Sequence, residues 1–82
     1  MTEIRVPAKL VKIEDIKGLI YKDYSAPCVL EAMADRDLLG KETMVLLSRT
    51  FFIPLGMAKY FVEPGESKEG LPTLILGRLV LP

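Results

Sequence analysis

The chain has 82 residues, of which 50% are apolar and 27% charged, and its 11 basic and 11 acidic side chains cancel to a formal net charge of zero. This length makes one domain near the lower limit of independent folding and leaves little room for a deep active-site cleft. The zero net charge excludes a strong long-range attraction to nucleic acid. Because no apolar stretch approaches the ~20 residues of a membrane-spanning helix and no signal peptide is visible, we expect a soluble, cytoplasmic protein.

The residue types that are missing exclude several kinds of catalytic and metal-binding site. Without His, neither a Ser-His-Asp nor a Cys-His system can be assembled, and the single thiolate of Cys28 cannot hold zinc. The clustered carboxylates lack the spacing and the glycine of a calcium loop; they are Glu14, Asp15, Asp35, Asp37 and Glu42. We therefore expect no enzyme activity and no catalytic, cofactor-binding or metal-binding residues. Cys28 is predicted to be a small buried core residue, and the absence of Asn and Gln is typical of thermophile proteins.

The first elements are predicted from periodicity. Apolar and polar residues alternate from Ile4 to Leu10, which indicates a half-buried strand, and Pro7 favours a place at the edge of a sheet. From Ile13 the apolar spacing changes to that of one or two helical turns. The next segment, Ser25 to Gly40, is compatible with two structures. Its caps and four-residue repeat favour a helix, whereas its β-favouring start and the Asp35–Asp37 cluster favour a strand followed by a turn.

The second half begins with strand-like sequence from Met44 to Ile53, which predicts two strands or one bent strand. Pro54 is allowed at the first position of a helix, and Leu55, Ala58 and Phe61 would share one face of a short helix packed onto the sheet. The helix must end before Pro64. A charged surface loop from Glu63 to Gly70 and a final strand from Leu74 to Leu81, kinked at Gly77, complete the chain. The apolar end at Pro82 predicts that residues 1–82 are one domain of a longer protein.

Two groups of residues are candidates for binding. Five cations lie in the first 22 residues together with two tyrosines that could stack on bases; they are Arg5, Lys9, Lys12, Lys17, Lys22, Tyr21 and Tyr24. Interleaved acidic residues reduce this stripe to about two net positive charges, so direct nucleic-acid binding is not expected. For protein contacts the candidates are Tyr21, Tyr24 and the Glu63–Gly70 loop, with a core role for either tyrosine as the alternative.

Several short motifs resemble a known family. The segment Thr50–Phe61 resembles the strand, Pro-Leu and helix signature of the small β-rich (B) domain of GINS replication subunits. Ile13–Ile16, Ala26–Val29 and Leu39–Gly40 are similar to further motifs of that domain, in the order of the archaeal-like subunits in which it precedes a helical domain. Gly56 departs from the pattern, because the family usually has a tryptophan there. The resemblance implies that Ser25–Met33 is a strand.

Together these observations predict an α+β fold, mainly a curved antiparallel sheet with one or two short helices. The resemblance implies a non-catalytic, architectural domain that helps to assemble the replicative helicase complex. Its implied partners are another GINS subunit, the MCM helicase and a RecJ-like protein. The alternative is a small nucleic-acid- or ribosome-binding β-barrel module of a thermophile. A helical domain following Pro82 would favour the first hypothesis.

Overall fold

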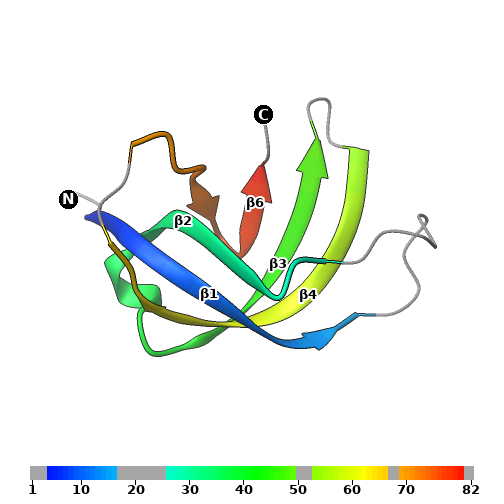
Figure 1. Ribbon diagram of the computed structural model, residues 1–82, viewed down its shortest axis with the longest axis horizontal. Coiled ribbons are helices and arrows are strands. Elements are labelled where there is room, and N and C mark those ends of the chain that lie inside the picture. Colours follow the sequence, from blue (N-terminus) through cyan, green and yellow to red (C-terminus); the bar gives the residue numbers. More distant parts are fainter. Residues whose placement is uncertain (1–3, 17–25, 50–52, 67–68, 81–82) are drawn as a thin grey trace.

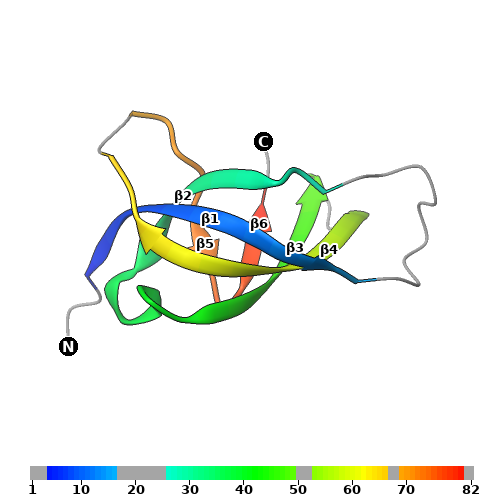
Figure 2. The same ribbon diagram turned by 60° about the horizontal axis from the view of Figure 1, so that its bottom comes forward.

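A computed structural model describes residues 4–16, 26–49, 53–66 and 69–80, which form a nearly closed six-stranded β-barrel (Figures 1 and 2). The strands are β1 (Arg5–Asp15), β2 (Val29–Asp35), β3 (Glu42–Arg49), β4 (Ile53–Pro64), β5 (Leu74–Ile75) and β6 (Arg78–Val80). Their order in the sheet is β2-β1-β4-β3-β6-β5, and every neighbouring pair is antiparallel except β3 and β6, which are parallel. One 3-10 turn, η1 (Arg36–Leu38), connects β2 to β3.

The barrel approaches closure where β2 meets the segment leading into β5. Met33 forms an isolated parallel bridge with Thr73, and its amide donates a hydrogen bond to the carbonyl of Pro72 over 2.8 Å. Opposite Met33 lies Pro7, whose carbonyl accepts a bond from Gly65 at the end of β4. The backbone polar groups of this residue pair therefore face away from each other, and Pro7 breaks no bond between β1 and β2.

The prediction of an edge strand for residues 4–10 was consequently wrong, because β1 lies between β2 and β4. Pro7 is tolerated there since its missing N–H falls where β4 ends. The helical turns predicted from Ile13 are also absent at residues 13–15, which extend β1 past a β-bulge between Lys12 and Glu14.

The predicted α+β class was wrong, because the segment expected to form a helix from Pro54 forms strand β4 instead. Buried residues alternate with less buried ones from Gly56 to Glu63, with Ala58, Tyr60 and Val62 facing the interior. This is the period of a strand, and it competes with the helical spacing of Leu55, Ala58 and Phe61. Phe61 consequently lies on the outer face of the sheet, opposite Val11 and Glu42. Pairing on both sides, with β1 and β3, stabilises the extended conformation.

The structure agrees with two further predictions and corrects a third. The strand alternative for Ser25–Gly40 is confirmed over the described residues 26–40, with η1 as the turn at Asp35–Asp37 and a left-handed Gly40. Met44–Ile53 spans two strands, since β3 ends at Arg49 and β4 begins at Ile53. The final segment is two short strands, β5 and β6, rather than the single kinked strand expected.

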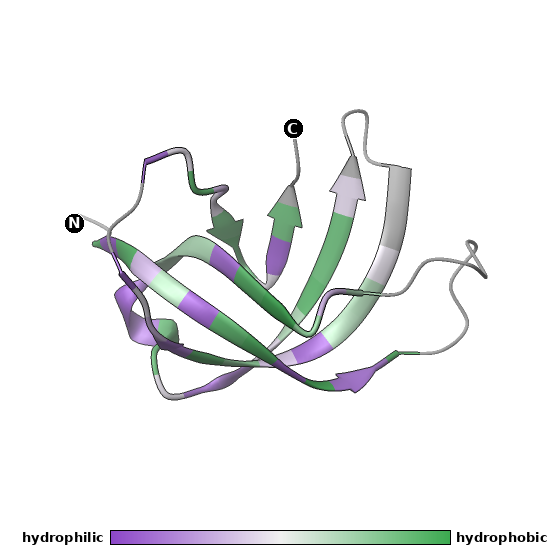
Figure 3. Ribbon diagram, in the orientation of Figure 1, coloured by the Kyte–Doolittle hydropathy of each residue, from purple (hydrophilic) through white to green (hydrophobic). Residues whose placement is uncertain are grey.

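Among the described residues, the interior of the barrel holds five alanines, six Leu and Val side chains and the ring of Tyr60. The buried hydrophobic residues are Ala8, Leu10, Ala26, Ala32, Ala34, Val45, Leu47, Ala58, Tyr60, Val62, Leu74 and Leu79. Ala8 lies directly opposite Ala32, and Ala58 lies opposite Val45. Alternation of hydrophobic and hydrophilic residues along β1 is visible in Figure 3.

Only glycine fits at position 77, in the turn between β5 and β6. It joins β5 to β6 with a φ of 76°, and a Cβ added to it would collide with the carbonyl oxygen of Met44 on β3. Its own carbonyl accepts a hydrogen bond from the amide of Leu46 over 3.1 Å. The turn between β5 and β6 is therefore packed tightly against β3.

Gly77→Ala should destabilise the protein by about 3 kcal/mol or more, because it adds a steric collision to the strain of a left-handed alanine. Gly40→Ala is a matched control: Gly40 has a φ of 79° but no atom within 4 Å of an added Cβ. It should cost only about 1 kcal/mol. Urea unfolding of both variants measures the difference, and equal losses would contradict the packing of the turn against β3.

Candidate functional site

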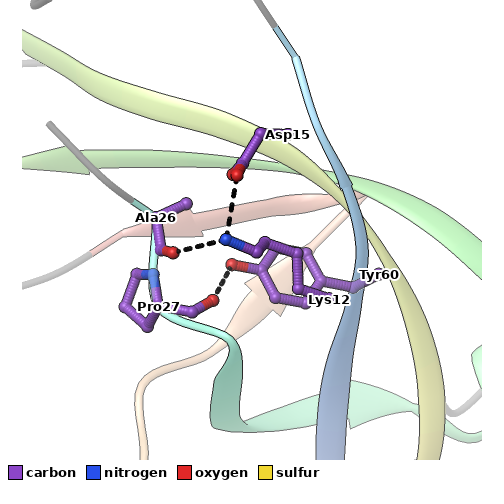
Figure 4. A network of polar contacts seen from close by, with 5 residues as sticks. All are labelled: Lys12, Asp15, Ala26, Pro27 and Tyr60. Carbon is purple, nitrogen blue, oxygen red and sulfur yellow. Dashed lines mark hydrogen bonds and ion pairs between the residues drawn. The ribbon is translucent and has the colours of Figure 1, made fainter.

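Polar contacts gather at one end of the barrel, around Lys12 and Tyr60 (Figure 4). These residues lie opposite each other on β1 and β4. The Nζ of Lys12 donates hydrogen bonds to Oδ2 of Asp15 and to the carbonyl of Ala26, each over 3.0 Å. The hydroxyl of Tyr60 donates to the carbonyl of Pro27 over 2.7 Å. Two side chains thus bind two successive carbonyls of the segment that leads into β2.

This network indicates a structural role rather than a catalytic one. The hydrogen bond to the Asp15 carboxylate raises the pKa of Lys12 above its ordinary value of 10.5, against a smaller effect of desolvation. The side chain of Lys12 is only 14% exposed. Its amine is therefore protonated at neutral pH, with two partners in place, and is not available as a neutral nucleophile or base.

The predicted basic stripe is largely neutralised where the structure describes it. Arg5 lies 3.7 Å from a carboxylate oxygen of Asp35, at ion-pair distance. Lys9 lies between Glu31 on β2 and Glu63 on β4 in the register of the sheet. The stripe therefore provides no continuous positive surface for a phosphate backbone along β1.

The remaining binding candidates are only partly described. Lys17, Lys22, Tyr21 and Tyr24 lie outside the described residues. Of the predicted Glu63–Gly70 loop, Glu63 and Pro64 belong to β4, and the described residues 65–66 and 69–70 are exposed, as expected for a surface loop.

Cys28 is exposed, which corrects the prediction that it is buried. Its backbone carbonyl accepts a hydrogen bond from the amide of Lys12 over 2.8 Å, so the main chain is fixed while the side chain faces outward. The carboxylates do not assemble either: within the described ranges, no three His, Cys, Asp or Glu residues lie together as a possible metal site.

The outer face of β3 carries an apolar cluster that the sequence analysis did not identify. Met44 and Leu46 alternate with the buried Val45 and Leu47 and so face outward. Met57 on β4 lies directly opposite Leu46. The turn that contains Leu76 packs against Met44. We call these four residues, Met44, Leu46, Met57 and Leu76, the β3 patch.

Two charged residues border the β3 patch. Lys59 lies opposite Met44 on β4, and Arg78 lies opposite Leu46 on β6. The Nζ of Lys59 is 3.0 Å from a carboxylate oxygen of Glu42, and this hydrogen bond raises the pKa of Lys59. The patch therefore has an apolar centre and a polar border, the arrangement found in many protein interfaces.

Leu76 is the most unusual residue of the patch. It is 92% exposed and has a φ of 48°, the left-handed region that a branched apolar residue rarely occupies. Ile75 pairs with Arg78, so Leu76 and Gly77 form a two-residue turn with positive φ at both positions. Such turns favour Asn-Gly, and leucine there costs roughly 1–2 kcal/mol of backbone strain. Backbone strain and an exposed apolar side chain thus coincide at Leu76.

A signal for this turn exists in the sequence. Leu76 and Gly77 separate the apolar Leu74-Ile75 from Arg78-Leu79, a spacing compatible with a tight hairpin. The prediction of one strand treated Gly77 as a kink and missed the reversal. Alternation along β3 places Met44 and Leu46 on one face and Val45 and Leu47 on the other. The sequence does not show which of these two faces is buried.

None of the helical structure in the described ranges is long and apolar enough to cross a membrane. Comparison with known proteins finds no matching family model, no similar curated protein and no matching solved structure.

Tyr60→Phe should lower the free energy of unfolding by about 1 kcal/mol, because it leaves the Pro27 carbonyl without its donor while the ring still fills the barrel. Tyr60→Ala, which also empties that space, should cost about 3–5 kcal/mol. Denaturant unfolding of the two variants separates the hydrogen bond from the packing. A Tyr60→Phe protein as stable as the parent would show that the hydroxyl contributes nothing.

Asp15→Asn should lower the pKa of Lys12 towards 10.5, since the carboxylate that stabilises the ammonium is removed. A pKa that is raised in the folded state contributes stability below the unfolded value and loses it as pH rises through the folded value. The variant should therefore be less stable than the parent at neutral pH and approach it at strongly alkaline pH. Side-chain NMR titration of Lys12 and unfolding at both pH values provide the measurements; an unchanged pKa would refute the assignment.

Proposed function

We propose that this chain is a non-catalytic protein-interaction domain that binds a partner through the β3 patch. The observation that carries the proposal is Leu76, an apolar side chain that is 92% exposed on a left-handed backbone. Selection for stability alone would favour Asn at this position. A strained residue held at an exposed site points to a function, because the strain is tolerated for a contact made elsewhere.

The surroundings of Leu76 support a protein partner. Met44 is 44% exposed, and Met57 is half-buried beside it on the neighbouring strand. Unbranched methionines adapt their shape and are frequent on binding surfaces. The ion pair of Lys59 with Glu42 lies at the border, where such charges govern specificity more than affinity.

The nucleic-acid alternative has one observation in its favour, the barrel itself, since that hypothesis expected a β-barrel. A fold does not determine a function, however, and the charges disfavour this one. Arg5 is at ion-pair distance from Asp35, and Lys12 donates to Asp15 and Ala26. Binding to phosphates would have to compete with these contacts.

Of the architectural role implied by the GINS resemblance, the proposal keeps only one part, that the domain is non-catalytic and binds other proteins. Residues 54–61, which carry the helix in the family signature, lie in β4 here. Participation in a helicase assembly, with another GINS subunit, MCM and a RecJ-like protein, stays a prediction of the resemblance. A cytoplasmic location is proposed on the single, unpaired Cys28.

Leu76→Asn should raise the free energy of unfolding by roughly 0.5–1 kcal/mol, because Asn tolerates the left-handed conformation, and should abolish partner binding. Val29→Thr is the control, since Val29 is 48% exposed on β2, away from the patch. The parent and both variants would be immobilised and exposed to extract of the native cells, and the retained proteins identified. We expect a specific protein on the parent and on Val29→Thr that is absent from Leu76→Asn.

Two results would overturn the proposal. One is a set of retained proteins that is the same for the parent and Leu76→Asn. The other is tight, salt-dependent binding of a single-stranded oligonucleotide that Leu76→Asn leaves unchanged, which would favour the nucleic-acid module.

A further inference from the structure

The β5–β6 hairpin, residues 74–80, is joined to the rest of the barrel along two narrow seams. β6 lies beside β3 (Figure 1) but pairs with it only over residues 46–48, whereas β2 pairs with β1 along its whole length. On the other side, the structure describes a single backbone bridge, from Met33 to Thr73. There the carbonyl of Pro72 accepts a hydrogen bond, but proline has no N–H to donate in return. The hairpin therefore has less backbone support than strands β1 to β4.

Ser48 lies in the seam between β3 and β6 and carries a buried hydroxyl that is not satisfied. It is opposite Val80 on β6, and a β-bulge separates it from Leu47 in the pairing with β4. The residue is 1% exposed, and its Oγ has no hydrogen-bond partner in the part of the chain that the structure describes. A hydroxyl buried in this way loses its bonds to water and gains none in return. Opening of the seam would return water to Ser48, so this hydroxyl favours the open state.

Backbone strain lies in the turn of the same hairpin. Leu76 has a φ of 48°, which a branched residue rarely adopts. The burial of Leu74 and Leu79, each 1% exposed, opposes the strain and the unsatisfied hydroxyl. The closed state is thus held by two apolar side chains and short pairing, while two local costs favour its release.

The other four strands are held together by contacts that do not involve the hairpin. Their order is β2-β1-β4-β3, with antiparallel pairing throughout. Lys12 and Tyr60 donate hydrogen bonds to the carbonyls of Ala26 and Pro27 at one end of this sheet. A sheet of three or more strands with a hydrophobic face can be stable without further strands. We call these four strands the body.

We propose that the β5–β6 hairpin opens as one unit while the body stays folded. In the open state the edge of β3 is unpaired, the amide of Leu46 has lost its bond to Gly77, and the hydroxyl of Ser48 reaches water. The inference goes beyond the proposed function and does not depend on it. It assigns to this barrel a conformational device, a β3 edge that is covered in one state and available for strand pairing in the other.

Native-state amide hydrogen exchange of the full 82-residue chain, followed by NMR, tests the proposal. The hairpin amides are those of Leu46 and Met33, which donate to the turn of the hairpin and to the segment that leads into it. The body amides are those of Lys12 and Val62, which donate to carbonyls outside the hairpin. We expect the two hairpin amides to share one opening equilibrium, about tenfold or more larger than that of the body amides. Their exchange should also depend less on urea, because partial opening exposes less surface than global unfolding.

Two variants separate opening of the hairpin from unfolding of the body. Ser48→Ala should slow exchange of the hairpin amides about tenfold, because the closed seam no longer contains an unsatisfied hydroxyl. Tyr60→Phe is the matched control, since its bond to Pro27 lies in the body and is present in both states. It should speed exchange of the body amides roughly fivefold and leave the hairpin amides unchanged.

Three results would overturn the proposal. One is exchange of both sets of amides with the same opening equilibrium and the same urea dependence, which would show that the barrel opens only as a whole. Another is a Tyr60→Phe protein in which both sets exchange faster by the same factor. The third is a pair of hairpin amides with different opening equilibria, which would show separate fraying.

Leu76→Asn is a second variant in case Ser48→Ala does not fold. It relieves the strain of the turn and should slow the hairpin amides about threefold. Exchange of the hairpin amides that neither variant slows would contradict the origin of the opening in this seam and turn.

Discussion

The hydrogen bonds from Lys12 and Tyr60 to the carbonyls of Ala26 and Pro27 are the constraint on which the barrel depends. Residues 26–28 lead into β2, and their backbone groups must be satisfied where the sheet is not yet paired. A side chain from β1 and one from β4 supply the donors from within the barrel end. The segment that leads into β2 is thereby held against both strands.

Tyr60 lies in an interior that is rich in alanine. Its hydroxyl reaches from β4 to the Pro27 carbonyl, and five of the 12 buried hydrophobic residues are alanines. Each alanine contributes little hydrophobic stabilisation compared with Leu or Ile. The interior also holds six Leu and Val side chains, while six other large apolar side chains of the described residues lie on the outer surface.

How much of this could be predicted from the sequence differs between elements. Alternation predicted a strand for residues 4–10, and β-favouring composition predicted strands for residues 44–53. For Ser25–Gly40, local sequence left a helix and a strand with a turn both open, because its four-residue repeat and its turn-forming residues compete. β4 was mistaken for a helix because its inward residues include Gly56 and Ala58, which give a weak period of two, while Leu55, Ala58 and Phe61 match the helical period. Tertiary pairing with β1 and β3 decided between them. The β3 patch could not be predicted, since it depends on which strands become neighbours.

Closure of the barrel has a consequence for the order in which the chain folds. The antiparallel pairs β1–β2 and β3–β4 join segments that are near in sequence. The pair of β1 with β4, the bridge from Met33 to Thr73 and the parallel pair of β3 with β6 join distant ones. Loop-closure entropy opposes the distant contacts until the hairpins exist. We therefore infer that the two hairpins form before the barrel closes and that refolding takes on the order of milliseconds to seconds, slow for so short a chain. Refolding in microseconds would contradict this order. A nascent chain would accordingly present an unpaired sheet edge on β3 until β6 has been synthesised, a period in which intermolecular strand pairing competes with folding.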